Sequence, residues 1–181
     1  MNIQSEKILL SNKAVLETID DMADRLYNDI THPEKRVVVG IRRGGAMVAR
    51  LLWERLNKLL GRELPIGFLD ISFYRDDHNT VSSNPIIGAT DLSMDIDDKR
   101  IILVDDVLFT GRTIRAALNA LFDYGRPEIV DLLVLADRGG RQLPISPNYA
   151  GLEVESEEME SIKLLNNKET GLVLVRRTLS E

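Results

Sequence analysis

Short apolar runs alternate along this chain with longer segments in which apolar residues recur every three or four positions. This recurrence places apolar side chains on one face of a helix. A first helix is predicted to begin after Ser11, which suits an amino-terminal cap, and to end before Pro33. A second is predicted to begin after Gly44-Gly45 and to run to about Leu60, where Gly61 would end it, and a third is predicted over 113–124.

Between the predicted helices lie short runs rich in Val, Ile and Leu, which favour buried strands. Alternation of strands and helices predicts an α/β fold with a mostly parallel sheet. Near the carboxyl end, residues 161–177 form two apolar runs around the turn "NNKETG", which indicates a closing hairpin. The predicted strands of the main sheet are residues 36–41, 65–74, 100–106 and 128–137.

Composition narrows the class of protein. The 181 residues, 44% of them hydrophobic, predict one domain, 1–181, with one well-filled core. The chain has no cysteine, and its histidines are His32 and His78, so a thiolate metal site is excluded and a reducing, cytoplasmic location is expected. No apolar stretch is long enough to span a membrane. A net charge of -6 opposes binding to polyanions unless the basic residues share one surface.

The segment "RIILVDDVLFTGRT", residues 100–113, carries the clearest chemistry. Its buried strand is predicted to end at Asp105 and Asp106. A turn follows, in which Gly111 would allow backbone N–H groups and threonine hydroxyls to surround a phosphate. Because carboxylates repel phosphate, the acid pair must face something else, either the hydroxyls of a sugar or a hydrated Mg²⁺. A phosphate and a diol on one sugar describe a ribose 5-phosphate.

Two other interpretations share part of this pattern. A nucleoside triphosphatase also ends a strand in aspartate, but it needs a Gly-Lys-Ser/Thr ending, and lysine never follows glycine in this chain. An ordinary strand-to-helix turn with an aspartate cap needs neither two acids nor two threonines.

The segment resembles the phosphoribosyl pyrophosphate (PRPP) loop of type I phosphoribosyltransferases. Four segments in order resemble the PyrR family, whose members are uracil phosphoribosyltransferases and pyrimidine operon attenuation regulators. The resemblance implies a central sheet flanked by helices, a small hood from residues 137–181, and a homodimer or higher homo-oligomer. It also implies conversion of uracil and PRPP to UMP and pyrophosphate with Mg²⁺ held by the acid pair. The four segments are residues 70–77, 104–113, 124–145 and 161–177.

The resemblance also assigns roles to residues. "GIRRGG", residues 40–45, corresponds to the pyrophosphate loop, and a mobile loop over about 75–94 would fold over the substrates. Asp105, Asp106 and Arg75 are the expected catalytic residues, with Arg75 facing pyrophosphate. The expected substrate-binding residues are Arg42, Arg43, Gly44, Val107, Leu108, Phe109, Thr110, Gly111, Arg112, Thr113, Arg138 and Gly139.

The chain departs from the family's pattern at several positions. The pyrophosphate loop usually ends in Thr-Arg-Gly, so which arginine meets pyrophosphate stays open. Phe109 stands where the family usually has tyrosine and purine enzymes usually have aspartate, which disfavours a purine substrate. No general base is identified.

A regulator that senses UMP or UTP and binds RNA is the alternative function. RNA binding is doubtful, because the first helix is acidic and the segment after "DRG" has lost basic residues. Arg25 and Arg141 are the basic exceptions. The acidic positions are Glu17, Asp20, Asp21 and Asp24, and the neutral ones are Gly140, Ser146 and Leu152.

Overall fold

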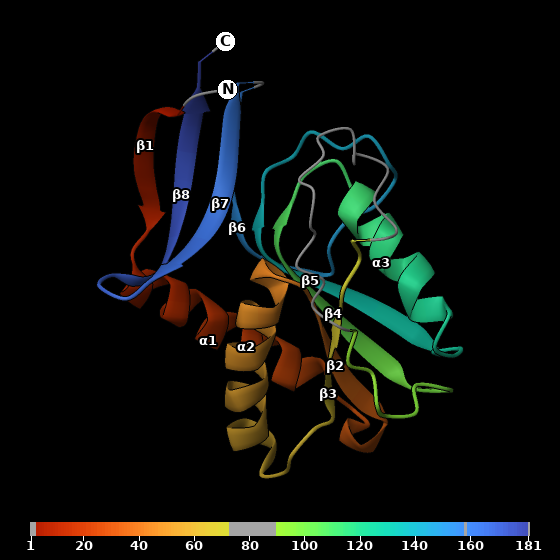
Figure 1. Ribbon diagram of the computed structural model, residues 1–181. Helices are drawn as coiled ribbons and strands as arrows, with labels where there is room; N and C mark the ends of the chain where they lie inside the picture. Colours follow the sequence, from red (N-terminus) through yellow and green to blue (C-terminus); the bar gives the residue numbers. More distant parts are fainter. Residues whose placement is uncertain (1–2, 73–89, 158, 181) are drawn as a thin grey trace.

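The computed structural model describes residues 3–72, 90–157 and 159–180. Its centre is a five-stranded sheet in the order β3-β2-β4-β5-β6, and every neighbouring pair is parallel. The predicted α/β class is confirmed, and the sheet's carboxyl ends share one edge (Figure 1). The strands are β2 (Arg36–Ile41), β3 (Ile66–Leu69), β4 (Arg100–Leu108), β5 (Ile129–Asp137) and β6 (Tyr149–Glu153).

Helices cover both faces of this sheet. α1 (Asn12–Asp29) and α2 (Gly44–Leu60) pack on one face, and α3 (Arg112–Phe122) packs on the other (Figure 1). Ser11 caps α1 as predicted, because its hydroxyl accepts a hydrogen bond from the Ala14 amide at 3.4 Å. Gly61 ends α2 in the left-handed conformation, with φ 64°. A short 3-10 helix, η1 (Pro33–Lys35), leads into β2.

Two apolar cores lie on the two faces of the sheet. Each strand sends alternate side chains to opposite faces, so β4 contributes Ile102 and Val104 to one core and Ile101 and Leu103 to the other. The first core also receives α1, α2 and apolar residues of β7 and β8, whereas α3 fills the second. Because helices cover both faces of the sheet, side chains of β2 and β4 are buried on both sides, which explains why these strands are continuous apolar runs in the sequence.

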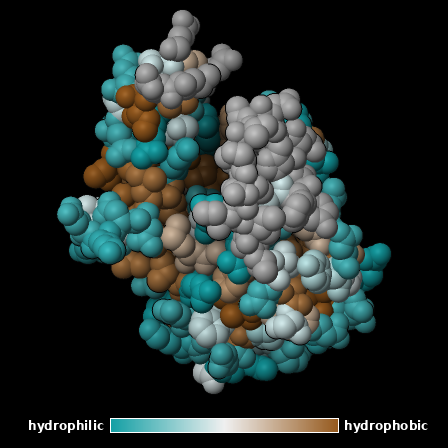
Figure 2. All heavy atoms as spheres, viewed as in Figure 1, coloured by the Kyte–Doolittle hydropathy of each residue, from teal (hydrophilic) through white to brown (hydrophobic). Residues whose placement is uncertain are grey.

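A second sheet forms the hood. β7 (Glu160–Asn167) and β8 (Gly171–Leu179) make the predicted hairpin, and β1 (Ile3–Leu10) pairs antiparallel with the outer edge of β8. The two ends of the chain therefore lie together at the tip of the hood (Figure 1). The hood was expected from the 137–181 region, which supplies β7 and β8; β1 joins them from the other end of the chain, and β6 pairs within the main sheet. Figure 2 shows apolar surface where the hood joins the α/β body.

Several predicted boundaries are also wrong. Of the strand predicted over 65–74, the described residues form only β3, because Asp70 turns the chain by accepting the Ser72 amide at 2.9 Å; residues 73 and 74 lie outside the described part. β4 extends two residues beyond the acid pair, since Val107 and Leu108 still pair with Ala136 and Asp137 of β5.

No helix among the described residues is both long and apolar enough to cross a membrane.

A polar cluster closes the amino-terminal edge of the sheet, opposite the acid pair. Arg36 is buried and donates to the Asp131 carboxylate at 2.7 Å. The Tyr149 hydroxyl donates to Asp29 at 2.7 Å, which fastens β6 to the end of α1. Burial raises the pKa of Tyr149 to about 12, and the hydrogen bond to Asp29 adds to the shift.

Candidate active site at the carboxyl ends of the strands

The acid pair lies inside β4, not at its end as predicted. Asp105 is 5% exposed, and its Oδ1 accepts a hydrogen bond from the Asp106 amide at 2.9 Å. Asp106 is half-buried. Because β4 is the central strand of the sheet, both aspartates stand on a rigid support near its carboxyl edge.

Two glycines bring the amino end of α2 against the acid pair. A Cβ on Gly44 would lie 2.2 Å from Asp106 Oδ2, and a Cβ on Gly45 would lie 2.5 Å from the Val104 carbonyl oxygen. Only glycine allows these approaches without displacement. The predicted pyrophosphate loop and the acid pair therefore form one site, although they lie 60 residues apart in the sequence.

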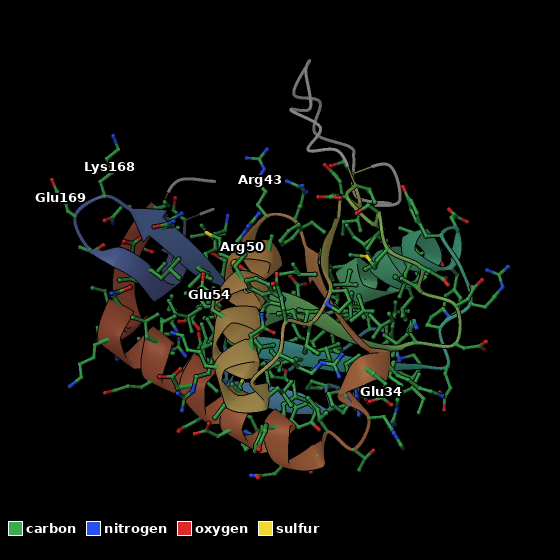
Figure 3. All side chains as sticks on the ribbon, turned by 90° about the horizontal axis from the view of Figure 1, so that it is seen from below. Glu34, Arg43, Arg50, Glu54, Lys168 and Glu169 are labelled. Atoms are coloured by element: carbon green, nitrogen blue, oxygen red, sulfur yellow. The ribbon has the colours of Figure 1, made fainter. Side chains whose placement is uncertain are left out.

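The two arginines of the pyrophosphate loop have different surroundings. The Arg42 amide donates to the Leu69 carbonyl at 2.8 Å, and its guanidinium lies 5.5 Å from the centre of the Phe68 ring. Arg50 of α2 lies over the same ring at 4.4 Å. Arg43 is exposed and projects from the amino end of α2 (Figure 3). Arg43 is thus the more exposed of the two, and Arg42 is held by its contacts with β3. The peptide bond between Arg42 and Arg43 is cis.

The next part of the site is the phosphate turn, residues 108–113. Gly111 has φ 90° and caps the amino end of α3, a conformation that L side chains rarely adopt. The Thr110 hydroxyl accepts a hydrogen bond from the Arg112 amide at 3.3 Å. The amino end of α3 carries a partial positive charge, so the turn suits an anion.

A second segment, residues 137–145, packs on the phosphate turn and is called the clamp segment. It holds three successive carbonyl groups of the turn. The Leu108 carbonyl accepts from the Arg138 amide at 3.0 Å, and the Phe109 carbonyl accepts from Arg141 Nη1 at 2.7 Å. The Thr110 carbonyl accepts from the Gln142 and Leu143 amides, at 3.0 and 3.1 Å.

Phe109 and Arg138 form a stacked pair. The Arg138 guanidinium lies 3.7 Å from the centre of the Phe109 ring. Arg138 is 8% exposed, and its Nε donates to the Ser156 hydroxyl at 2.8 Å. Burial lowers the pKa of Arg138, but the group stays charged at neutral pH. Phe109 is 40% exposed, and Gly140 lies close to its ring, since a Cβ there would be 2.4 Å from Phe109 Cε2.

The uracil contacts expected from main-chain groups around Arg138 and Gly139 stay a prediction, and the two amides have partners within the protein. The Arg138 amide is engaged by Leu108, and the Gly139 amide donates to Asp137 Oδ1 at 2.9 Å. Base recognition through these two amides would require those bonds to break. A groove of about 600 Å³ adjoins them, lined by Asp137, Arg138, Gly139, Glu153, Val154 and Glu155.

Arg75 and most of the predicted mobile loop lie outside the described residues. The described end of that loop is attached to the sheet. Asp91 exchanges two main-chain hydrogen bonds with Phe68 of β3, both at 2.8 Å, and Leu92 and Met94 pack against the second core. Residues 91–94 are therefore part of the body, contrary to the expectation for 75–94.

The acid pair supplies a donor set that suits Mg²⁺. No cluster of three or more His, Asp or Glu side chains that could hold a metal occurs in the described part of the chain. Mg²⁺ is ordinarily held by one or two carboxylates together with substrate phosphates and water, so two aspartates beside a phosphate turn fit it. The half-buried Asp106 is the more accessible of the two.

Comparison with known proteins gives the family. Residues 5–164 match the phosphoribosyl transferase domain family. A relative named bifunctional protein PyrR from Acetivibrio thermocellus is 40% identical over 86% of this chain and 85% of its own length. The chain belongs to the PyrR family. Relatives of the same name from Caldicellulosiruptor bescii and Actinobacillus pleuropneumoniae serotype 5b are 46% and 39% identical, covering 78% and 94% of this chain and 80% and 97% of their own.

Solved structures confirm the phosphoribosyltransferase fold. A hypoxanthine-guanine phosphoribosyltransferase from Bacillus anthracis superposes with a TM-score of 0.69 at 18% identity, covering 99% of this chain and all of that one. The hypoxanthine phosphoribosyltransferase of Trypanosoma cruzi gives 0.68 at 20% identity over 95% and 97% of the two chains. At this identity the likeness establishes the fold of this PyrR family member, but it does not identify the nucleobase that the protein uses.

Sequence reasoning missed three contributors to this site. Phe68 supports Arg42, Arg141 holds the Phe109 carbonyl, and Ser156 holds Arg138. Their partners are distant in sequence, so no local pattern marks Phe68 or Ser156. For Arg141 a weak signal existed, because "DRGGR" places an aspartate and an arginine four residues apart around two glycines.

Proposed function

We propose that this PyrR family protein is a uracil phosphoribosyltransferase. N1 of uracil releases its proton to solvent and bonds to C1 of the ribose of PRPP, the bond from C1 to the pyrophosphate oxygen breaks, and UMP and pyrophosphate leave. The observation that carries the proposal is the acid pair of β4, placed between a phosphate turn and the amino end of α2. These three parts match the sugar, 5-phosphate and pyrophosphate of one substrate.

Different groups of the site bind different parts of PRPP. The 5-phosphate binds the N–H groups of the phosphate turn and the amino end of α3. Asp105 and Asp106 face the ribose hydroxyls. Arg43 and the amino end of α2 meet the pyrophosphate, whose charge grows as C1 becomes cationic. Mg²⁺, held by the acid pair and substrate oxygens, would neutralise further charge on the leaving group. Arg75 is proposed to cover the pyrophosphate from its loop.

The base is assigned to uracil by family and by Phe109. A phenyl ring carries no proton acceptor for a purine ring, and it is stacked on Arg138 beside the phosphate turn. The structural neighbours named for hypoxanthine share the fold at low identity, so both base classes belong in the test. Turnover of PRPP with uracil, hypoxanthine, guanine and orotate separates them. UMP formation is expected with uracil, and product with a purine alone would refute the base assignment.

Two variants test the acid pair directly. Asp105→Asn and Asp106→Asn keep side-chain size and remove charge, so each is expected to fold and to lose at least about 100-fold in kcat/KM. The loss is expected because a neutral amide neither balances the developing cation nor binds Mg²⁺ as well. Full activity in both variants, with unchanged circular dichroism, would show that the ribose site lies elsewhere.

An RNA-binding regulator that senses UMP or UTP is the second candidate, and a second function would agree with the word bifunctional in the name of the relatives. The side chains argue for weak RNA binding. Arg25 donates to the Ala150 carbonyl at 3.1 Å and lies over the Tyr149 ring. Arg141 is engaged inside the clamp segment. The basic residues expected to meet RNA thus have partners within the protein.

A further inference from the structure

The contacts of the phosphate turn determine where its N–H groups point. In the described part of the chain the one cis peptide bond joins Arg42 and Arg43, so the peptide planes of the turn are trans. In a trans plane the carbonyl and the following N–H point in opposite directions. Because the clamp segment holds three carbonyls of the turn, those of residues 108–110, the N–H groups of Phe109, Thr110 and Gly111 point away from it.

The middle carbonyl of the three has a different kind of donor from its neighbours. Leu108 and Thr110 are held by main-chain amides, whereas the Phe109 carbonyl is held by the Arg141 side chain at 2.7 Å. The plane that Arg141 controls carries the Thr110 N–H, at the centre of the turn. A substitution can therefore release this plane while the main-chain bonds on either side remain.

The Arg141 guanidinium is itself fixed from several directions. Its Nη1 also contacts the Gly139 carbonyl at 3.1 Å, and its Nε donates to the Ile145 carbonyl at 2.8 Å. Its Nη2 pairs with the Asp137 carboxylate. Burial opposes ionisation of Asp137, yet hydrogen bonds from Arg141 and the Gly139 amide keep its pKa below the ordinary value. A planar fork with five donors suits this set of acceptors, and an ammonium does not.

We propose that Arg141 is a positioning residue for phosphate binding. By holding the Phe109 carbonyl it aims the Thr110 N–H at the 5-phosphate of the substrate, and it touches no substrate atom itself. This inference rests on the proposed phosphoribosyl chemistry of the site, but it does not depend on which base is used.

The test measures PRPP binding by calorimetry, with Mg²⁺ and without base. Arg141→Lys keeps the charge and loses the fork, so its Kd for PRPP is expected to rise about tenfold. KM for PRPP should rise by a similar factor while kcat changes less than about twofold, because the phosphate is held equally in ground and transition states. A merely structural role would lower the melting temperature without this split.

A matched control is Arg126→Lys. Arg126 also donates to main-chain carbonyls, those of Phe122 and Gly125, at the far end of α3. Its substitution should leave the PRPP Kd unchanged. Asp137→Asn weakens the support of Arg141 without touching the turn, and should raise the Kd about threefold even where Arg141→Lys does not fold.

Wild-type PRPP affinity in both Arg141→Lys and Asp137→Asn overturns the inference. Failure of the proposed function has a different signature, because PRPP would bind and respond to Arg141→Lys while uracil turnover was absent.

Discussion

Replacing Gly44 by alanine would separate the chemistry of the site from the stability of the fold. Gly44 is the first residue of α2 and its φ is not positive, so alanine can adopt its backbone conformation. The new methyl group would lie 2.2 Å from Asp106 Oδ2 and 2.3 Å from its Cγ. The atoms that must move are the far end of a side chain, not main chain.

The size of the effect follows from these distances. Ordinary contact begins near 3.4 Å, so the Asp106 carboxylate must shift by about 1.2 Å. A misplacement of about 1 Å at a catalytic group costs about 100-fold, or about 2.7 kcal/mol of transition-state stabilisation. The stability terms oppose each other, because an off-rotamer aspartate costs about 0.5–1.5 kcal/mol and alanine in a helix gains up to about 1 kcal/mol. The melting temperature should move by less than about 3 °C.

The assay compares kcat/KM for UMP formation with thermal unfolding in three variants. Gly44→Ala should lose activity and keep stability. At Gly45 the methyl group would meet main chain, the Val104 carbonyl at 2.5 Å and Asp105 Cα at 2.8 Å, so Gly45→Ala should unfold at least about 6 °C lower.

Gly61→Ala serves as the control, because nothing lies within 4 Å of its Cβ and only its left-handed backbone is strained. It should lose about 1 kcal/mol of stability and no activity. Gly44→Ala with kcat/KM within threefold of wild type and an unchanged melting temperature would refute the argument that Asp106 acts from its observed position.

Three further outcomes are expected. The pKa of Tyr149 is about 12 in the folded protein against an ordinary 10, so its contribution to stability is present below pH 10 and is lost as the pH rises towards 12. Over that range the melting temperature of Tyr149→Phe should therefore fall less steeply with pH than that of wild type. In steady-state kinetics, Arg43→Ala should raise KM for PRPP more than Arg50→Ala, since Arg43 projects from the amino end of α2 and Arg50 packs on Phe68. Titration with a pyrimidine-leader RNA hairpin in the presence of UMP should show no specific submicromolar binding, and such binding would restore the regulator interpretation.

The alternation of strands and helices was predictable because its signals are local. Ser11, Gly61 and the apolar runs of β2 and β4 each act within a few residues. β1 gave no such signal, because six of its eight residues are exposed and its pairing partner β8 lies at the other end of the chain. β6 is a short, half-buried edge strand that pairs only with β5. Edge strands that pair on one side with a distant segment lack the periodic pattern of apolar residues from which a strand can be predicted.

The same distinction applies to the site. The acid pair and the phosphate turn were predictable, because two acids, a glycine and two threonines within nine residues have few structural uses. The end of β4 was placed too early, since charged side chains suggested a loop while the pairing of Val107 and Leu108 with β5 continued. The approach of Gly44 to Asp106 depends on the parallel order of β2 and β4, which composition does not specify.

Arg141 links the two candidate functions of this protein in one residue. Four of the five N–H groups of the Arg141 guanidinium bond to Phe109, Gly139, Ile145 and Asp137. A bidentate contact with an RNA phosphate would therefore break at least one of these bonds and loosen the clamp segment on the phosphate turn. RNA binding through Arg141 would then weaken the grip on the 5-phosphate, and binding of the phosphate would hold Arg141 inward. Linkage requires this opposition to be reciprocal. In this chain the neutral residues Gly140 and Ser146 flank Arg141 within the same region, so few other cations are available to offset the lost bonds, and the balance favours the nucleotide site.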